Sequence, residues 1–265
     1  THAIAHVVRC FENQKITHVN NKLDPLEDIE IIEMELILSD IETLEKAKES
    51  LNKKIKSGDK SIFLKLETIE KFLIGLAKGI NARSIDCNED DINLIKEFNL
   101  ISLKPVIYVA NIDESENNAE AVKKVKEKAM QDNSEVIEMC NQLEAEISEL
   151  GDDKEDFLKE IGLDEPGLDR FIRIAYKTLG YKTFFTAGEK EVRSWVIKSG
   201  YKAPQAAGVI HTDFEKGFIR AETISFNDFI KFNGEQGSKA AGKWRSEGAE
   251  YIINDGDVIL FRFNV

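Results

Sequence analysis

Leu103-Lys104-Pro105-Val106-Ile107-Tyr108-Val109-Ala110-Asn111-Ile112-Asp113-Glu114 is the stretch that decides the fold. Its apolar run has the length of one strand, and a run without polar alternation is typical of a parallel strand that is buried on both faces. Three of the last four residues are polar. Open parallel sheets bind ligands at the carboxyl ends of their strands, so we expect a ligand site at residues 111–114.

Further strands and helices alternate around this stretch. A helical pattern over 118–131 is followed by a strand at Glu135–Cys140 and a helix at Gln142–Leu150. This alternation predicts a parallel sheet flanked by helices. The opening run Ala3–Phe11 is interpreted as another strand of that sheet, buried on both faces. A strand so close to the first residue suggests that earlier members of the sheet are missing from the sequence.

Two long helical patterns separate the two α/β pieces. Apolar residues of the second pattern step by 4, 3, 4, 3 and 4, which is a heptad seam, and the strongest break between the patterns is Ser57-Gly58-Asp59. We expect an antiparallel helical hairpin that projects roughly 35–40 Å. The predicted packing residues are Met34, Ile37, Leu38, Ile41, Leu44, Leu51 and Ile55 in the first helix and Ile62, Leu66, Ile69, Leu73, Leu76 and Ile80 in the second.

The hairpin is expected to interrupt a single sheet domain, because neither α/β piece has enough strands for a core of its own. A short helix is predicted near Glu89–Phe98. From Thr183 onward the sequence changes to short strands at Thr183–Gly188, Glu191–Ile197 and Tyr251–Val265, with one helix near Gln205–Asp213. This pattern predicts a small α+β domain. The resulting division is 1–24 and 102–182 for the sheet domain, 25–101 for the hairpin and 183–265 for the last domain.

Composition describes an ordinary globular protein. Of the 265 residues, 42% are hydrophobic and 32% are charged, and no run reaches the roughly 18 apolar residues of a membrane span. The first residues show no export signal. Cys10, Cys87 and Cys140 are isolated and have no metal-ligand spacing. We therefore expect a cytoplasmic protein with reduced thiols, no metal site of its own and no membrane partner.

The net charge of −13 argues against a general nucleic-acid coat, and DNA is not an expected partner. Residues 183–265 carry 11 Lys or Arg and 11 Asp or Glu, so the whole negative excess lies in residues 1–182. Any partner that carries phosphates would have to be met by local patches of positive charge.

Two such patches are candidates for RNA binding. The expected hairpin tip holds six lysines against Glu49 and Asp59, and these lysines either solvate an exposed tip or contact phosphates. The segment Lys239–Arg245 combines three cations with a tryptophan in a glycine-flanked loop, which suits phosphate contact with base stacking, or a tryptophan that anchors the loop. The candidate residues are Lys46, Lys48, Lys53, Lys54, Lys56, Lys60, Lys239, Lys243, Trp244 and Arg245.

Asn111-Ile112-Asp113-Glu114 has the form of the N-K-x-D motif by which GTPases read guanine, with Ile112 in place of Lys and Glu114 in place of Asp. In guanine readers the final carboxylate accepts from the ring N1–H, which adenine lacks. An Asn amide can pair with the N6 amine and N7 of adenine. The two departures therefore favour adenine, although a plain polar turn would also explain four residues.

The next predicted strand ends in Met139-Cys140-Asn141-Gln142, where a GTPase fold places its second base-side loop. Backbone N–H groups of such a loop can meet the base edge without particular side chains. The alternative is a simple helix start with Asn141 as the N-cap.

No G-x-x-x-x-G-K-[ST] occurs in the sequence, so the usual phosphate cradle and the hydroxyl that it offers to Mg²⁺ are absent from it. His2, His6, His18 and His211 form no cluster, and we expect His211 to cap or pack a helix. No catalytic residue is predicted.

The longest motifs resemble one family. These are His211–Glu222, Asp255-Gly256-Asp257-Val258 and Phe261–Val265, with Phe185-Thr186-Ala187-Gly188, Asn111–Glu114 and Val7–Phe11 upstream. Together they are similar to the YchF family of Obg-related P-loop ATPases, along essentially the whole chain. The resemblance implies an ATP-preferring, ribosome-associated protein whose Ras-like sheet domain carries a coiled-coil insertion and is followed by a β-grasp TGS domain.

By position, the resemblance implies that Asn111 reads adenine, Ile112 packs on the base, Glu114 closes the motif, and Met139, Cys140 and Asn141 line the far side. ATP is the implied cofactor, with Mg²⁺ in a complete family member. Because the phosphate-binding motifs are absent, we expect the chain itself not to hydrolyse ATP. We expect a monomer that binds ribosomes or ribosomal RNA, and the alternative is an RNA-binding adaptor for which nucleotide is incidental.

Overall fold

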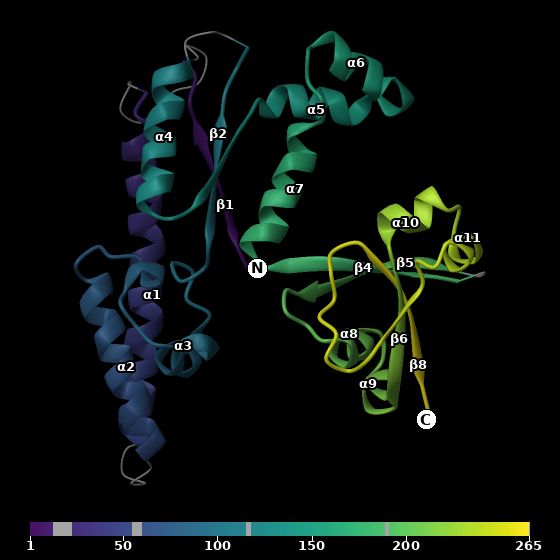
Figure 1. Cartoon of the computed structure of the whole chain (residues 1–265). Coiled ribbons are helices and arrows are strands. Elements are labelled where there is room, and N and C mark those ends of the chain that lie inside the picture. Colours follow the sequence, from purple (N-terminus) through teal and green to yellow (C-terminus); the bar gives the residue numbers. More distant parts are fainter. Residues whose placement is uncertain (13–22, 55–59, 115–117, 189–190, 265) are drawn as a thin grey trace. The chain divides into compact units, whose positions relative to one another are not determined.

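The structure, a computed structural model, describes residues 1–12, 23–54, 60–114, 118–188 and 191–264. The chain divides into two compact units, Thr1–Ala175 and Tyr176–Val265. Each unit has its own sheet and its own apolar core (Figure 1).

The sheet of the first unit has three parallel strands in the order β1 (Ile4–Arg9), β2 (Val106–Asn111), β3 (Glu135–Met139). Val7 is opposite Val109, so two runs that lie about a hundred residues apart form neighbouring strands, as predicted. β2 is central and its residues from Val106 to Ala110 are all buried. This confirms the prediction of a strand that is covered on both faces.

β1 differs from the prediction. It is an edge strand of the described sheet, and the side chain of Val7 is 53% exposed. Side chains of a strand alternate between two faces. At β1, Val8 and the following Cys10 reach the core, whereas Ala5 and Val7 remain exposed. The prediction that this strand is buried on both faces was wrong, because only one of its faces is covered.

Two helices cover that face, α1 (Pro25–Lys54) and α4 (Ala119–Gln131). α4 occupies the predicted helical span, and Figure 1 shows both helices alongside the strands. The core between helices and sheet consists of Val8, Cys10, Ile29, Val106, Tyr108, Ala110, Ala121, Val122, Val125 and Ala129.

α1 also packs against α2 (Lys60–Leu76), and α2 in turn packs against α3 (Glu89–Ile95). Ile37 and Leu44 of α1 meet Ile69, Phe72 and Leu76 of α2 in a second core. The two long helices run antiparallel. Glu33, early in α1, bonds to Asn81 beyond the end of α2, whereas Lys48, late in α1, pairs with Glu70.

The buried faces of this helix pair differ in part from the predicted faces. Met34, Leu38 and Ile80 are largely exposed, while Phe72, which lies outside the predicted seam, is fully buried. Ile55 lies outside the described residues. The difference between the predicted and the buried face has its cause in α1. The buried positions of this helix include the carboxylates Glu33 and Asp40 as well as isoleucines and a leucine. A pattern of apolar residues alone cannot reveal such a face.

The carboxylate of Asp40 fastens the segment that leads into β2. It accepts hydrogen bonds from the backbone N–H groups of Ile101 and Ser102, both at 2.7 Å, and from the Ser102 hydroxyl at 2.6 Å. These bonds satisfy a charge that is 1% exposed.

Glu33 is the centre of a buried charged cluster, the Glu33 cluster, which joins α1, α4 and β2. Its members are Glu33, Arg83, Tyr108, Lys128 and Asp132. Glu33 Oε1 lies 2.5 Å from Arg83 Nη2, and Glu33 Oε2 lies 3.0 Å from Lys128 Nζ. The Tyr108 hydroxyl donates to Asp132 at 2.6 Å. Burial raises the pKa of Tyr108 strongly, and the bond to Asp132 adds to the shift. Tyr108 therefore acts as a neutral donor.

Three helices follow the first sheet, α5 (Asn141–Glu149), α6 (Lys154–Glu160) and α7 (Gly167–Thr178). α5 occupies the span predicted for a helix. Single turns of 3₁₀ helix occur at Ala82–Ser84, Lys96–Phe98 and Gly151–Asp153.

The second unit is built on a mixed sheet in the order β5-β4-β8-β6-β7. Its strands are β4 (Tyr181–Ala187), β5 (Val192–Lys198), β6 (Phe218–Ser225), β7 (Arg245–Glu247) and β8 (Asp257–Phe263). β4 and β8 are parallel, and the other neighbours are antiparallel. Its core packs Phe184 edge-on against Phe261, with α8 (Ala203–Ile210) contributing Ala203, Ala206 and Ala207.

The prediction of one helix in this unit was wrong. Besides α8, the described residues form α9 (Thr212–Lys216), α10 (Phe226–Lys231) and α11 (Glu235–Ala240). Strands β6 and β7 were not predicted either. Helices of five or six residues are too short to show a period of 3.6 residues. His211 caps α9 through Nδ1, which accepts from the Asp213 N–H at 3.2 Å, as expected for a capping residue.

An ion triad around the buried Glu222 explains part of the longest sequence motif. Arg220 on β6 lies directly opposite Arg262 on β8. Glu222 accepts from Arg220 Nη2 at 3.0 Å and from Arg262 Nη2 at 2.9 Å. Burial tends to raise the pKa of Glu222, but the hydrogen bonds from both arginines outweigh it and hold that pKa below its usual value. The carboxylate thus offsets the repulsion between two like charges that face each other across the ladder.

Candidate functional site

The carboxyl ends of the three parallel strands are held together beyond the strands themselves. The Cys10 N–H donates to the Asn111 carbonyl at 2.8 Å, and the Ile112 N–H donates to the Met139 carbonyl at 3.1 Å. The polar residues that follow β2 therefore lie beside the loop that follows β3. This is the edge at which we predicted a ligand site.

The side chain of Asn111 joins these two loops. Its Oδ1 accepts from the backbone N–H of Asn141 at 3.1 Å. This bond orients the amide, so that the Nδ2 group, with two hydrogens, is the donor left for a ligand. Asn141 is the first residue of α5 and Cys140 is the preceding cap position, so the alternative in which Asn141 is the N-cap was wrong.

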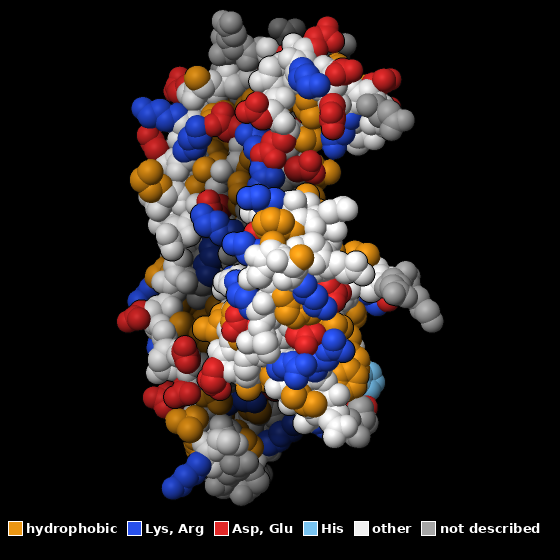
Figure 2. All heavy atoms as spheres, turned by 45° about the vertical axis from the view of Figure 1, so that its right-hand side comes forward, with side chains coloured by type: hydrophobic (Ala, Val, Ile, Leu, Met, Phe, Trp, Pro, Cys, Tyr) orange, Lys and Arg blue, Asp and Glu red, His pale blue; other side chains and the backbone are white. Residues whose placement is uncertain are grey.

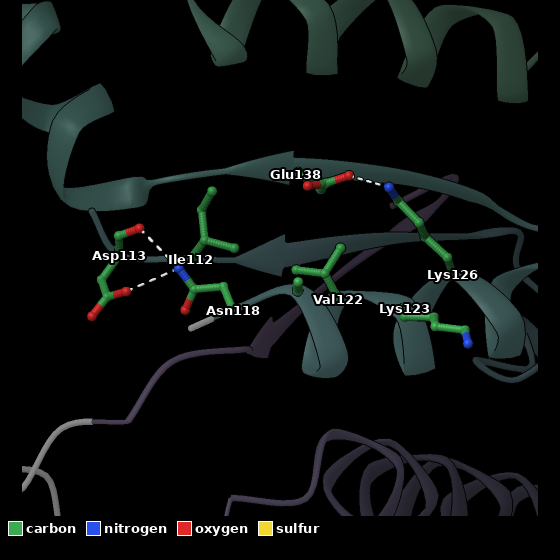
Figure 3. A pocket seen from close by; sticks show the side chains of 8 residues that line it. Ile112, Asp113, Asn118, Val122, Lys123, Lys126 and Glu138 are labelled. Atoms are coloured by element: carbon green, nitrogen blue, oxygen red, sulfur yellow. Dashed lines mark hydrogen bonds and ion pairs between the residues drawn. The ribbon is translucent and has the colours of Figure 1, made fainter. Parts of the chain in front are cut away.

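A hollow of about 450 Å³ opens next to this edge, between α4 and β3. Figure 3 shows Asp113 and Asn118 at one end and the Lys126–Glu138 ion pair at the other. Asn118 Nδ2 donates to the carbonyl and the carboxylate of Asp113, both at 3.0 Å, and so shapes the loop after β2.

The other predicted site residues are less closely joined. Ile112 lines the hollow and packs against the α4 side of the core. Met139 and Cys140 are half-buried and Glu114 is exposed. Burial raises the pKa of the nearby Cys10 thiol to about 11, which makes it unreactive at neutral pH. The structure thus brings Asn111 and Asn141 into direct contact, with Ile112, Met139 and Cys140 around them.

The lysines at the end of the helix pair are partly neutralised. Lys46 pairs with Glu42, and Lys48 pairs with Glu70 at 2.9 Å. Lys53, Lys54 and Lys60 are exposed, and Lys56 lies outside the described residues.

The segment Lys239–Arg245 is not a loop throughout, because Lys239 lies in α11 and Arg245 begins β7. Lys239 Nζ lies 3.9 Å from the ring centre of Trp244 and also pairs with Glu235. Arg245 pairs with Glu247 at 3.2 Å. Figure 2 shows acidic and basic side chains interspersed over the face in view. Lys243 lies between α11 and β7 and is exposed.

Sequence reasoning missed Glu144 and Arg170, which bond the first turn of α5 and the end of β3 to α7. Their partners are backbone groups far along the chain, so no local pattern marks them.

Within the part of the chain that the structure describes, no three His, Cys, Asp or Glu side chains converge on a metal position. The described residues therefore offer no set of three protein side chains that could hold Mg²⁺ by themselves. None of the helices in the described ranges has the length and apolar character of a membrane span.

Comparisons with known proteins agree along the chain. A family model, YchF-GTPase_C, described as a protein of unknown function (DUF933), matches residues 181–264. "Ribosome-binding ATPase YchF" of Haemophilus ducreyi is 51% identical over 268 residues, which cover 100% of this chain and 74% of that protein. The protein of the same name from Bacillus subtilis is 48% identical over 99% of this chain and 73% of its own length.

The solved structure of the Schizosaccharomyces pombe YchF GTPase has a TM-score of 0.78 and 31% sequence identity to this chain, and covers 98% of this chain and 72% of its own. Fold and site together define an α/β protein that presents paired polar loops at the carboxyl edge of a parallel sheet and carries a second, mixed sheet. The chain belongs to the YchF family.

Proposed function

We propose that the chain recognises the base of a purine nucleotide, adenine in preference to guanine, at the carboxyl edge of the first sheet. The observation that carries the proposal is the 3.1 Å bond between Asn111 Oδ1 and the Asn141 N–H, which joins two adjoining loops and leaves the Nδ2 group of Asn111 as the donor for a ligand. A purine N7 is an acceptor that this donor fits.

The preference for adenine rests on the atoms at position 6 of the purine. N7 is common to both bases, whereas adenine presents an amine at position 6 and guanine presents a carbonyl. Asn111 Oδ1 keeps a second lone pair that can accept from an amine. The Asn141 N–H, which could donate to a carbonyl, is already engaged. In this arrangement Ile112 packs on the base, and Glu114, Met139 and Cys140 border it.

The related bacterial proteins carry the name of a ribosome-binding ATPase, and we propose that this chain supplies the base-reading and ribosome-contacting parts of such a protein. The helix pair would be its coiled-coil arm and the second unit its TGS domain of β-grasp type. The sequence lacks the phosphate-binding motif. We therefore expect these residues by themselves to bind ATP weakly and not to hydrolyse it, because phosphate contacts are among the strongest available to a nucleotide.

Asn111→Ala is expected to weaken ATP binding about tenfold, because the substitution removes two hydrogen bonds. One is the proposed bond to the base, and the other is the bond to the Asn141 N–H that orders the loop after β3. Titration of ATP and GTP, followed by NMR chemical shifts, measures the effect. Asn93→Ala is the matched control, because Asn93 is exposed on α3. Equal affinities for ATP and GTP in the unsubstituted chain would contradict the preference for adenine.

A second candidate function is an RNA-binding adaptor of the ribosome in which nucleotide is incidental. It is supported by the exposed lysines Lys53, Lys54 and Lys60 at one end of the helix pair, and by the Lys239–Trp244 contact beside the exposed Lys243. An aromatic ring with cations next to it suits stacking on a base beside a phosphate.

Reversing the charge of Lys53, Lys54 and Lys56 to Glu, and separately Lys243→Glu, is expected to lower the fraction of protein that co-sediments with ribosomes severalfold, because each change removes attraction to phosphates. Lys123→Glu and Lys159→Glu, on exposed positions of α4 and α6, are the controls. Unchanged co-sedimentation of both variants would remove the adaptor function.

A further inference from the structure

Glu144 links the loop after β3 to the start of α7. It lies in the first turn of α5, and its two carboxylate oxygens accept from the backbone N–H groups of Gly167, at 2.7 Å, and Leu168, at 3.0 Å. Those are the first two residues of α7, whose N–H groups have no partner within the helix. A carboxylate is also favoured there by the helix dipole. Glu144 therefore caps a helix that begins 23 residues later.

The start of α7 packs closely on the end of β3. A Cβ atom at Gly167 would lie 2.7 Å from Glu144 Oε1 and 3.2 Å from Met139 Cβ, so a residue without a side chain is needed there. One turn further on, Arg170 Nη2 donates to the Glu138 carbonyl at 3.2 Å. α7 thus contacts the last two residues of β3 as well as the first turn of α5.

These contacts hold the same loop that meets Asn111. Within it, the Asn141 N–H bonds to Asn111 Oδ1, and the Glu144 N–H donates to the Cys140 carbonyl at 2.9 Å. The loop is bonded on one side to the residue that reads the base and on the other side to α7. A change in its backbone would therefore disturb both sets of bonds.

We propose that Glu144 and Arg170 are positioning residues of the nucleotide site, which set the Met139–Asn141 loop by docking it on the start of α7. The inference rests on the proposed recognition of the base by Asn111. Because binding free energies are reciprocal, a nucleotide that favours the docked loop also strengthens the docking of α7, by the same factor.

The test follows hydrogen exchange of the Asn141, Gly167 and Leu168 amides in the 265-residue chain, with and without saturating ATP. ATP is expected to slow exchange at all three. Glu144→Ala is expected to speed exchange at Gly167 and Leu168 and to weaken ATP binding about fivefold to tenfold, within the range of typical coupling between sites. Glu144→Gln keeps one acceptor oxygen and should recover part of the affinity. Glu146→Ala, on the exposed side of α5, is the control.

A double-mutant cycle with Asn111→Ala separates positioning from a general loss of structure. If Glu144 acts through the loop that Asn111 holds, the double variant should lose less affinity than the sum of the single variants. Additive losses would overturn the inference, and so would ATP protection of Asn141 without protection of Gly167 and Leu168. No ATP protection of Asn141 in the unsubstituted chain would instead show that the proposed nucleotide function is wrong. If Glu144→Ala fails to fold, two measurements test the inference in its place. They are the ATP affinity of Glu144→Gln and the hydrogen exchange of the unsubstituted chain with and without ATP.

Discussion

Glu33→Ala is expected to destabilise the first unit by about 3–5 kcal/mol, because it leaves the two cations Arg83 and Lys128 with a single carboxylate, Asp132, in a largely buried cluster. Arg83 and Lys128 both lie within 3.0 Å of the Glu33 carboxylate, and their side chains are only 11% and 18% exposed. Burial alone would lower the pKa of Lys128, but hydrogen bonds to Asp132 and Glu33 hold it above its usual value. When Glu33 is removed, Asp132 remains as the carboxylate that pairs with this lysine.

Denaturant unfolding followed by hydrogen exchange in β2 measures this loss, since exchange separates the stability of the two units. Glu35→Ala, on the exposed side of the same helix, should change stability by less than about 0.5 kcal/mol. If the two variants were equally stable, the Glu33 cluster would not be what fastens α1 and α4 to the sheet.

Phe184→Ala is expected to destabilise the second unit by about 3–5 kcal/mol, because it removes a large side chain and leaves a cavity in a packed core. Phe184 is 0% exposed, and its ring centre lies 5.8 Å from that of Phe261 in an edge-on arrangement. Edge-on aromatic pairs add to the contribution of burial.

Hydrogen exchange in β8 is the measurement for this variant. Val192→Ala, on β5 of the same sheet, should have little effect on stability, since Val192 is 73% exposed.

The losses of stability caused by Glu33→Ala and by Phe184→Ala should each be confined to one unit. Glu33→Ala should leave the local exchange of β8 unchanged, and Phe184→Ala should leave that of β2 unchanged, because the residues lie in different compact units. A loss in both sheets from either variant would contradict this independence.

Much of the first unit could be predicted because its strands and helices have distinctive local patterns. The continuous apolar run before Asn111 predicted the central strand, and the strand–helix alternation after it predicted parallel neighbours, as β1, β2 and β3 show. Asn111 was predicted as a site residue because polar residues follow its strand, and Met139, Cys140 and Asn141 were predicted because a GTPase fold places its second base-side loop after the next strand. Their contact through Oδ1 confirms that they lie together, while their role in reading a base remains a proposal.

The residues that could not be predicted are those whose partners are distant in sequence. Glu33 and Asp40 interrupt the apolar face of α1, and only their partners at Arg83 and Ser102 explain why they are buried. Short helices such as α9 and α10 are stabilised by caps and packing and carry no periodic signal. Glu144 likewise has no sequence motif that would connect it with Gly167.

The sequence by itself thus determined the three parallel strands and the long helices α1, α2 and α4 of the first unit, and which polar residues lie at the ends of those strands. Those properties follow from backbone preferences and from the spacing of apolar side chains over a few turns. Only the tertiary structure decided that Glu33 meets Lys128 and that Glu144 caps α7, because a hydrogen bond between distant segments depends on how the chain is packed.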